Sequence, residues 1–569
     1  MLMTHSRLIT ILHMMAFLKL FLILVLLAPT FQALVEEPSR PREDGIQAMI
    51  ARACVDVEDE ISCLSNVQSK LSSYQQLNAT SVLLAATEAT LNEALLTIAM
   101  LTRFTLLSTS RSREQIAIED CKELLDFTVT ELSWSLTEMR MLRSPTETTG
   151  KYVQHHEHEG NLKAWLSAAL GNQDTCLEGF QGTNQDTKNM IKGNLKQVTQ
   201  LVSNILTMYT QFHASPFTSP RDNNYTIEVD EPKFPEWITE GNKEILVASP
   251  KGIHVDAVVA VDGTGKYRSI AQAIQEAPSY SNRKYVIYVK KGVYNENIDM
   301  KRKKANIMMI GDGIGETVIS GNRNFMQGWT TFRTATFGKS SFHVHHAVSG
   351  QGFIARDITF RNTAGPFNRQ AAALRVDSDR SAFFRCSIEG YQDTLYAHSL
   401  RQFYRDCHIH GTIDFLFGNG AAVFQNCDIH VREPLPPQKP TIAAQGRKSP
   451  SQSTGFVVQD SRIQATLPTY LGRPWRAYSR VVYMNCYLGP GVQPRGWLEW
   501  YGGFGLGTSY FGEYRNYGPG AGLAGRVTWP GYHILGSTSE AVVFTVRWFI
   551  DGLSWLPATG VQFSSGLSN

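Results

Sequence analysis

A short strand-like unit recurs through the second half of the chain. Four segments share one arrangement of apolar and aromatic residues around a cysteine: "AFFRCSIEG", "QFYRDCHIHG", "AVFQNCDIH" and "RVVYMNCYL". Their first three cysteines, Cys386, Cys407 and Cys427, lie 21 and 20 residues apart. A repeat of roughly 20 to 25 residues built from short strands is typical of a solenoid, and in a parallel β-helix equivalent residues of successive coils stack on one another. The repeat therefore predicts a parallel β-helix.

Two aspartates follow the same repeat. The stretches "GYQDTLYAH" and "GTIDFLFGN" place Asp393 and Asp414 21 positions apart. Equivalent residues on adjacent coils are separated by about one strand spacing, roughly 4.8 Å. A carboxylate among Tyr, Leu and Phe costs free energy unless it is paired, hydrogen-bonded or used in chemistry. The sequence thus predicts two neighbouring carboxylates and a candidate catalytic site.

The rest of the chain divides into three parts. Residues 45–212 repeat apolar residues at spacings of three and four, which predicts an antiparallel helical bundle. Residues 213–250 are polar and rich in proline, as expected for a linker before a β-helix over 251–560. Residues 1–33 contain basic residues, the run "LFLILVLLA" and a small-residue exit, which indicate a signal peptide, with a signal anchor as the alternative.

The two halves have opposite charge. Residues 1–250 contain 20 Lys and Arg against 30 Asp and Glu, a net charge of −10, whereas residues 251–569 contain 34 against 21, a net charge of +13. Such halves attract each other, and the basic half suits a polyanion. A signal peptide argues against nucleic acid and favours an acidic extracellular polysaccharide.

Secretion would allow disulfides and glycans. Cys54 and Cys63 are close enough in sequence to join an N-terminal hairpin, and Cys121 with Cys176 would join two later helices, pairings that rest on proximity alone. Cys386 and Cys407 are further disulfide candidates, and the pairing of Cys427 and Cys486 stays open. Glycosylation sequons begin at Asn78 and Asn224. The runs "HHEHEG" from His155 and "HVHH" from His343 lack the spacing of a closed zinc site, so we expect no metal.

Five motifs occur in order between Gly292 and Trp475: "GVYNENI", "QAAALR", "YQDTL", "DFLFGN" and "LGRPW". They resemble the signatures of plant pectin methylesterases, over about Val255 to Leu556. The first half, with four cysteines and "WLSAALGNQDTCLEGF", resembles the pectin methylesterase inhibitor domain that many such enzymes carry as a pro-region. The resemblance implies a right-handed parallel β-helix preceded by a four-helix bundle. It also implies a secreted cell-wall enzyme that needs no cofactor.

The implied reaction is hydrolysis of the C6 methyl esters of galacturonate units in pectin (homogalacturonan), with release of methanol. The resemblance assigns Asp414 as the nucleophile, oriented by Arg473, and Asp393 as the acid and then the base. Gln370 and Gln392 would donate hydrogen bonds to the tetrahedral oxyanion.

The same resemblance implies a substrate groove. Gln370, Arg473 and Thr331 would contact the substrate. Sugar rings have apolar faces, so aromatic side chains should line the groove. Six aromatic residues occupy the corresponding positions, and we expect about half to face the groove: Phe332, Tyr396, Phe417, Tyr470, Trp475 and Trp500.

The chain also departs from the family pattern. An insertion, "GKSSFHVHH", occupies residues 338–346. At the processing junction, "GNKEILVAS" replaces the usual basic pair, so the bundle could stay uncleaved. An uncleaved bundle could cover the site of its own β-helix or act on another chain. One alternative is therefore an inhibitor or binding protein whose esterase half is impaired by the insertion. Another is a β-helix glycosidase or lyase, because paired carboxylates also serve glycoside hydrolysis.

Overall fold

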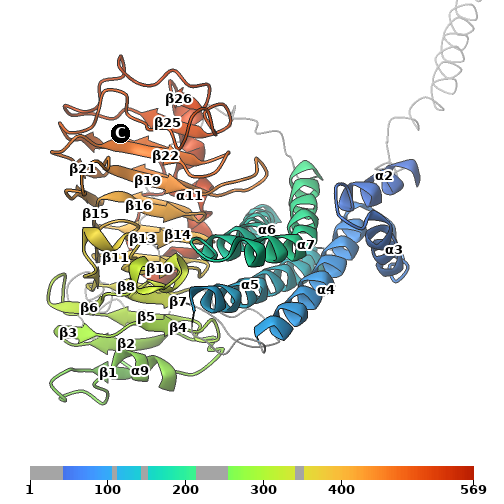
Figure 1. Ribbon diagram of the computed structural model, residues 1–569, viewed down its shortest axis with the longest axis horizontal. Coiled ribbons are helices and arrows are strands. Elements are labelled where there is room, and N and C mark those ends of the chain that lie inside the picture. The colour runs from blue at the N-terminus through green and yellow to red at the C-terminus, as the bar shows by residue number, and fades with distance from the viewer. Residues whose placement is uncertain (1–42, 106–111, 143–150, 213–253, 340–351, 569) are drawn as a thin grey trace, which may run out of the picture.

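The protein has a helical domain lying beside a tall β-helix (Figure 1). The computed structural model describes residues 43–105, 112–142, 151–212, 254–339 and 352–568. The expected signal peptide, the linker over 213–250, the processing junction, Asn224 and residues 340–346 of the insertion lie outside the described residues.

The helical domain contains two short and four long helices within the described residues. They are α2 (Glu43–Ala53), α3 (Glu60–Leu71), α4 (Ala79–Thr105), α5 (Arg113–Leu142), α6 (Lys151–Gly179) and α7 (Gln185–Phe212). Helices α4 and α6 each pack against both α5 and α7, so the four long helices form the expected four-helix bundle, and α2 and α3 are additional. Helix α4 is long and apolar enough to span a membrane by length and composition alone, but it packs within this bundle.

Apolar spacing and disulfides explain this domain. In α7 the buried Leu195, Val198 and Val202 recur at three and four residues, which places them on one face. The predicted disulfides are confirmed: Cys54–Cys63 joins the residue that follows α2 to α3, and Cys121–Cys176 joins α5 to α6.

The β-helix is built from three parallel sheets within the described residues. The eleven-stranded sheet has the order β1 (Ala257–Val259), β2 (Tyr285–Val289), β5 (Ile307–Ile310), β8 (Ile354–Arg356), β11 (Ser381–Phe384), β14 (Arg401–Arg405), β17 (Ala421–Gln425), β20 (Gly455–Gln459), β23 (Arg480–Met484), β25 (Tyr510–Tyr514) and β26 (Tyr532–Ile534). The seven-stranded sheet has the order β22 (Tyr470–Pro474), β19 (Thr441–Gln445), β16 (Ile413–Gly418), β13 (Leu395–Ala397), β10 (Leu374–Val376), β7 (Phe337–Lys339) and β4 (Ile298–Met300). The eight-stranded sheet has the order β24 (Tyr487–Leu488), β21 (Arg462–Gln464), β18 (Asp428–Val431), β15 (His408–Gly411), β12 (Ser387–Glu389), β9 (Thr359–Asn362), β6 (Thr317–Gly321) and β3 (Gly292–Asn295).

Short helices close the ends and one side of the β-helix. Helix α9 (Ile270–Glu276) buries Ile270 and Ala273 in the interior near β1. At the C-terminus α10 (Thr538–Ala541), α11 (Val546–Phe549) and α12 (Gly552–Trp555) pack against apolar residues of the eleven-stranded sheet. The 3₁₀ segments are η1 (Phe325–Gln327), η2 (Thr331–Arg333), η3 (Pro366–Asn368), η4 (Val542–Phe544) and η5 (Pro557–Thr559).

The interior of the β-helix shows the stacking that the repeat predicts. Phe383, Tyr404 and Phe424 stack in successive coils, with ring centroids 4.9 and 4.7 Å apart. The cysteines are also buried there, but Cys386, Cys407, Cys427 and Cys486 are free thiols, so Cys386 and Cys407 were wrong as disulfide candidates. Equivalent side chains of parallel coils point the same way instead of converging, and a disulfide needs converging Cβ atoms. The Cys386 and Cys407 thiols instead face the backbone carbonyls of Ala355 and Phe383 at 3.5 Å.

Candidate active site

Asp393 and Asp414 lie on adjacent coils of the seven-stranded sheet. Strands β13 and β16 pair with Leu395 opposite Leu416, and the N–H of Asp393 donates to the carbonyl of Ile413 at 3.1 Å. Both aspartates are buried and have left-handed backbone conformations, with φ of 61° and 50°, which Asp adopts more readily than most residues. The carboxylates therefore occupy equivalent places one repeat apart.

Arg473 distinguishes the two carboxylates. From β22, its Nε donates to Asp414 Oδ1 at 2.8 Å and its Nη2 to Asp414 Oδ2 at 2.5 Å, a bidentate pair. The guanidinium also lies 4.2 Å from the ring centroid of Trp500. Asp414 thus has a cationic partner that fixes its orientation.

Asp393 has the opposite environment. Burial, followed by the negative charge of Asp414, raises the pKa of Asp393 well above its usual value. The raised pKa favours the protonated state of Asp393, which suits a general acid beside a nucleophile.

The two glutamines lie on the coils that lead to Asp414. Gln392 directly precedes Asp393, and its carbonyl accepts the N–H of Ala371, which follows Gln370, at 3.2 Å. Both glutamines are half-buried. The Gln370 Oε1 atom is buried without a hydrogen-bond partner among the described residues. The fold therefore leaves part of the hydrogen-bonding capacity of this amide group unsatisfied.

Most of the predicted aromatic lining forms one cluster. The rings of Tyr396 and Phe417 stack with centroids 4.2 Å apart, and Trp475 meets Phe417 edge-on at 6.1 Å. Phe332 and Trp500 belong to the same cluster. Tyr470 does not belong to it, although it is half-buried at the start of β22. The half-buried Thr331 begins η2, next to Phe332.

The aromatic cluster continues into the helical bundle. Phe127 of α5 lies 6.5 Å, between ring centroids, from Phe332. Thr175 of α6 lies 2.9 Å from His398 Nε2 and 3.5 Å from the Tyr396 hydroxyl. Helix α6 and the β-helix together line a small pocket there, which includes Glu178. The bundle therefore covers the side of the seven-stranded sheet on which the predicted groove lies (Figure 1).

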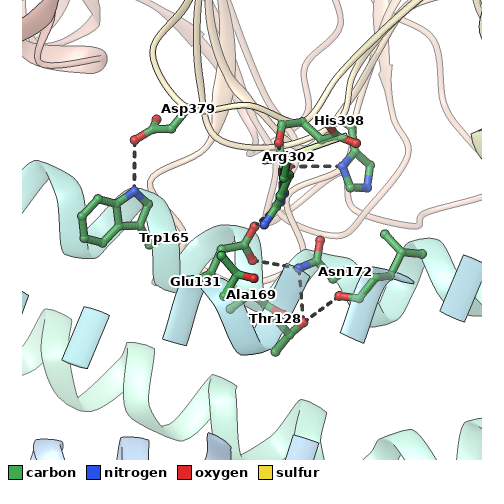
Figure 2. Close-up of polar contacts among 12 residues, drawn as sticks. Thr128, Glu131, Trp165, Ala169, Asn172, Arg302, Asp379 and His398 are labelled. Atoms are coloured by element: carbon green, nitrogen blue, oxygen red, sulfur yellow. Dashed lines mark hydrogen bonds and ion pairs between the residues drawn. The ribbon is translucent and has the colours of Figure 1, made fainter. Parts of the chain in front are cut away.

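A buried ion pair joins the bundle to the β-helix (Figure 2). Arg302 Nη2 donates to Glu131 Oε1 at 2.9 Å, and both side chains are almost fully buried. Asn172 Nδ2 donates to the other oxygen of Glu131 at 2.8 Å. Burial raises the pKa of Glu131 to about 7.

Further polar contacts surround this pair. The indole N–H of Trp165 donates to Asp379 Oδ2 at 3.0 Å (Figure 2). Acidic residues of the bundle also pair with basic residues of the β-helix: Asp120 and Glu123 with Arg333, Glu157 with Arg380, Asp174 with Lys448, and Glu178 with Arg476. Our sequence reasoning identified none of these individual residues; the opposite net charges of the two halves were the only signal.

Two other predicted features have local roles. His158, from the first histidine run, lies 2.7 Å from Glu138 Oε1. The half-buried Asn78 accepts the N–H of Ser81 at 2.9 Å, at the start of α4, and its glycosylation stays a prediction. The run from His343 lies outside the described residues.

Fold and site together define a parallel β-helix with two neighbouring buried carboxylates and a helical bundle packed against the sheet that carries them. The pectinesterase family profile matches residues 256–553, and the plant invertase/pectin methylesterase inhibitor profile matches residues 48–208. The chain belongs to the pectinesterase family of carboxylic ester hydrolases and carries an inhibitor-like domain.

Individual plant relatives are similar in sequence to this protein over most of its length. The chain is 58% identical to "Putative pectinesterase/pectinesterase inhibitor 22" of Arabidopsis thaliana, over 93% of this chain and 95% of that protein. It is 50% identical to "Pectinesterase/pectinesterase inhibitor PPE8B" of Prunus persica, over 79% and 82% of the two chains. The solved structure "Pectin methylesterase from Carrot" is 51% identical, with a TM-score of 0.53, and matches 55% of this chain and 99% of its own.

Proposed function

We propose that this chain hydrolyses the C6 methyl esters of galacturonate units in pectin, releasing methanol and leaving carboxylates. The observation that carries the proposal is the buried Asp393–Asp414 pair, in which only Asp414 is held by Arg473. Membership of the pectinesterase family supports the choice of an ester substrate. The basic β-helix half suits this polyanionic product and substrate.

In the proposed reaction, an Asp414 oxygen attacks the ester carbonyl and forms a tetrahedral intermediate. The amides of Gln370 and Gln392 donate hydrogen bonds to its oxyanion, each worth roughly 3 to 4 kcal/mol in comparable enzymes. Asp393 then protonates the leaving methoxide as methanol departs, leaving an acyl-enzyme on Asp414. The ionised Asp393 next takes a proton from water, which attacks the acyl-enzyme and frees Asp414. The raised pKa of Asp393 supports its role as the proton donor.

We also infer that the uncleaved bundle silences the β-helix to which it is joined. The contacts of Thr175 with Tyr396 and His398, and the Glu178–Arg476 ion pair, support this inference: Tyr396 is among the residues predicted to line the groove, and the charge of Glu178 acts on Asp393. The unusual junction "GNKEILVAS", without a basic pair, favours retention of the bundle. The N-terminal leader pattern supports secretion to the cell wall.

The insertion leaves an inhibitor or binding protein as the second candidate. Gly338 and Lys339, its first two residues, continue β7 and pair with β4, and Gly338 also pairs with Arg375 of β10. This continuity favours an intact groove and hence the esterase. Inhibition of a separate pectinesterase without methanol release by this chain would favour the second candidate, and new reducing ends in pectin would indicate a glycosidase.

The test is methanol release from highly methylated pectin by residues 251–569, beside an Asp414→Asn variant. The β-helix half should release methanol, and the variant should not, while both keep the same circular dichroism spectrum. Absence of methanol from a folded β-helix half would contradict the proposal.

A further inference from the structure

Three histidines gather on the outer face of the eight-stranded sheet, away from the aromatic cluster. His408 and His410 flank Ile409 on β15, and because Ile409 is fully buried, the alternation of a strand directs both histidines outward. His430 on β18 is the register partner of His410. One ring nitrogen from each histidine lies within 4.8 Å of the other two.

Nothing else in the described structure uses these ring nitrogens. The His410 and His430 rings stack with centroids 4.4 Å apart and an interplanar angle of 8°, and the His408 ring lies 5.9 Å from that of His430. All three side chains are partly exposed. None of their nitrogens has a hydrogen-bond partner among the described residues, although buried and half-buried polar atoms usually have one.

We propose that His408, His410 and His430 bind one borderline divalent cation, Zn²⁺ or Cu²⁺, across two successive coils of the β-helix. Imidazole is a preferred ligand of both ions. A His-x-His pair on one strand with a third histidine on the next strand supplies three ligands on one surface. Solvent supplies the remaining position, because the cluster is open to water.

The geometry requires only side-chain rotation. A tetrahedral zinc ion with Zn–N distances of about 2.1 Å places its ligand nitrogens about 3.4 Å apart. The present limit of 4.8 Å between nitrogens must therefore shrink by about 1.4 Å at most. No hydrogen bond among the described residues holds the rings, so the rotation has to undo the stacking of His410 on His430 but breaks no hydrogen bond.

Charges of both signs lie near the cluster, and the positive charge of Arg432 acts on His410 and His430. Glu389 on β12 is the register partner of His410, and Asp428 on β18 is the register partner of His408. Their charges are partly balanced by Arg361, 2.7 Å from Glu389, and Arg462, 3.8 Å from Asp428.

A bound ion would connect β15 to β18, and β15 is followed within four residues by Asp414. The ion would therefore stabilise the coil that carries the nucleophile without touching it. Because a ligand that binds only the folded state raises apparent stability, zinc should raise the Tm of the chain.

The test is a Zn²⁺ titration of the untagged full chain by calorimetry and equilibrium dialysis, with the Tm measured in zinc and in chelator. One zinc ion should bind per chain and raise the Tm. The His410→Gln/His430→Gln double variant should bind zinc at least about tenfold more weakly and lose the Tm increase, while its Tm in chelator stays near that of the parent. If the double variant does not fold, His408→Gln, which removes one partly exposed ligand, should show the same loss.

Two matched controls separate this cluster from other histidines. His254→Gln, at an exposed histidine, and the His343→Gln/His345→Gln/His346→Gln triple variant should both keep parental zinc binding. Equal affinity in the parent and in the double variant, loss of binding in the triple variant alone, or no stoichiometric binding by the parent would each overturn the proposal. None of these readouts depends on methanol release.

Discussion

The site residues of the β-helix are regularly spaced in the sequence, whereas the residues of the helical bundle that contact the β-helix are not. In the β-helix, residues of successive coils stack, so Asp393 and Asp414 recur at the repeat interval of 21 residues. In the bundle, the residues that meet the β-helix extend from Arg113 on α5 to Thr207 on α7 without a fixed spacing. The site of a stacked fold can therefore be predicted from the spacing of its residues. For a helical surface that binds a partner, the sequence predicts little more than the sign of the net charge.

The largest effect should come from the stacked carboxylates. Asp393→Asn removes the proposed general acid and should lower methanol release from the β-helix half by about two to four orders of magnitude. Asn tolerates the positive φ of 61° at this position, so the fold should persist. Asp406→Asn is a matched control, since Asp406 also has a positive φ, of 53°, and lies outside the site. Comparable losses in both variants would mean that coil geometry, not acid catalysis, explains the effect.

The next effect concerns the partner surface of the bundle. At about pH 8, where Glu131 is ionised, Glu131→Ala leaves Arg302 buried without its carboxylate partner, so it should weaken association of residues 43–212 with the β-helix half by about 3–5 kcal/mol. Arg140→Ala breaks the exposed Arg140–Glu88 pair and should change it by about 1 kcal/mol or less. Calorimetry of the two halves measures both, with circular dichroism to confirm that each bundle is folded. A similar affinity for the two variants would contradict the central position of Glu131.

A reducing agent should lower the stability of the helical bundle but not that of the β-helix. Reduction of Cys121–Cys176, which closes a separation of 55 residues, should destabilise the bundle by about 2–4 kcal/mol. The Tm of the β-helix half should not change, because its cysteines are free in the described structure. A fall in that Tm on reduction would show that its thiols form disulfides in solution.

A smaller effect should appear in the pH dependence of association. Burial raises the pKa of Glu131 and of Glu178 from 4.5 to about 7. A carboxyl whose pKa is raised in the bound state binds a proton more tightly there, so association should be strongest near pH 4.5 and weaken as the pH rises to about 7. Glu131 should dominate, because the Glu178 side chain is 28% exposed and its interactions are screened by water.

Affinity measured at about pH 5 and about pH 8 tests this dependence, with Glu131→Gln as the matched variant. The variant cannot titrate at this position and should show a flatter profile. Tighter binding at the higher pH would contradict the assigned environment of Glu131.

More of the β-helix than of its contacts with the bundle could be predicted from the sequence. The β-helix and the stacked aspartates follow from the repeat and the family motifs, and five of the six aromatic residues that the resemblance suggested lie in one cluster. The same stacking misled the cysteine prediction, because regular spacing places Cys386 and Cys407 side by side without turning their side chains toward each other. The Glu131–Arg302 pair and the Trp165–Asp379 hydrogen bond join residues more than 170 positions apart, and no local pattern predicts such contacts.

The central claim is that the bundle silences an intact carboxylate site in its own chain. It is tested most directly by methanol release, at about pH 8 where Glu131 is ionised, from the uncleaved full chain, the full chain with Glu131→Ala, and the β-helix half. The account predicts little release from the full chain, more from the variant and most from the β-helix half. Equal release from the full chain and the β-helix half would contradict it.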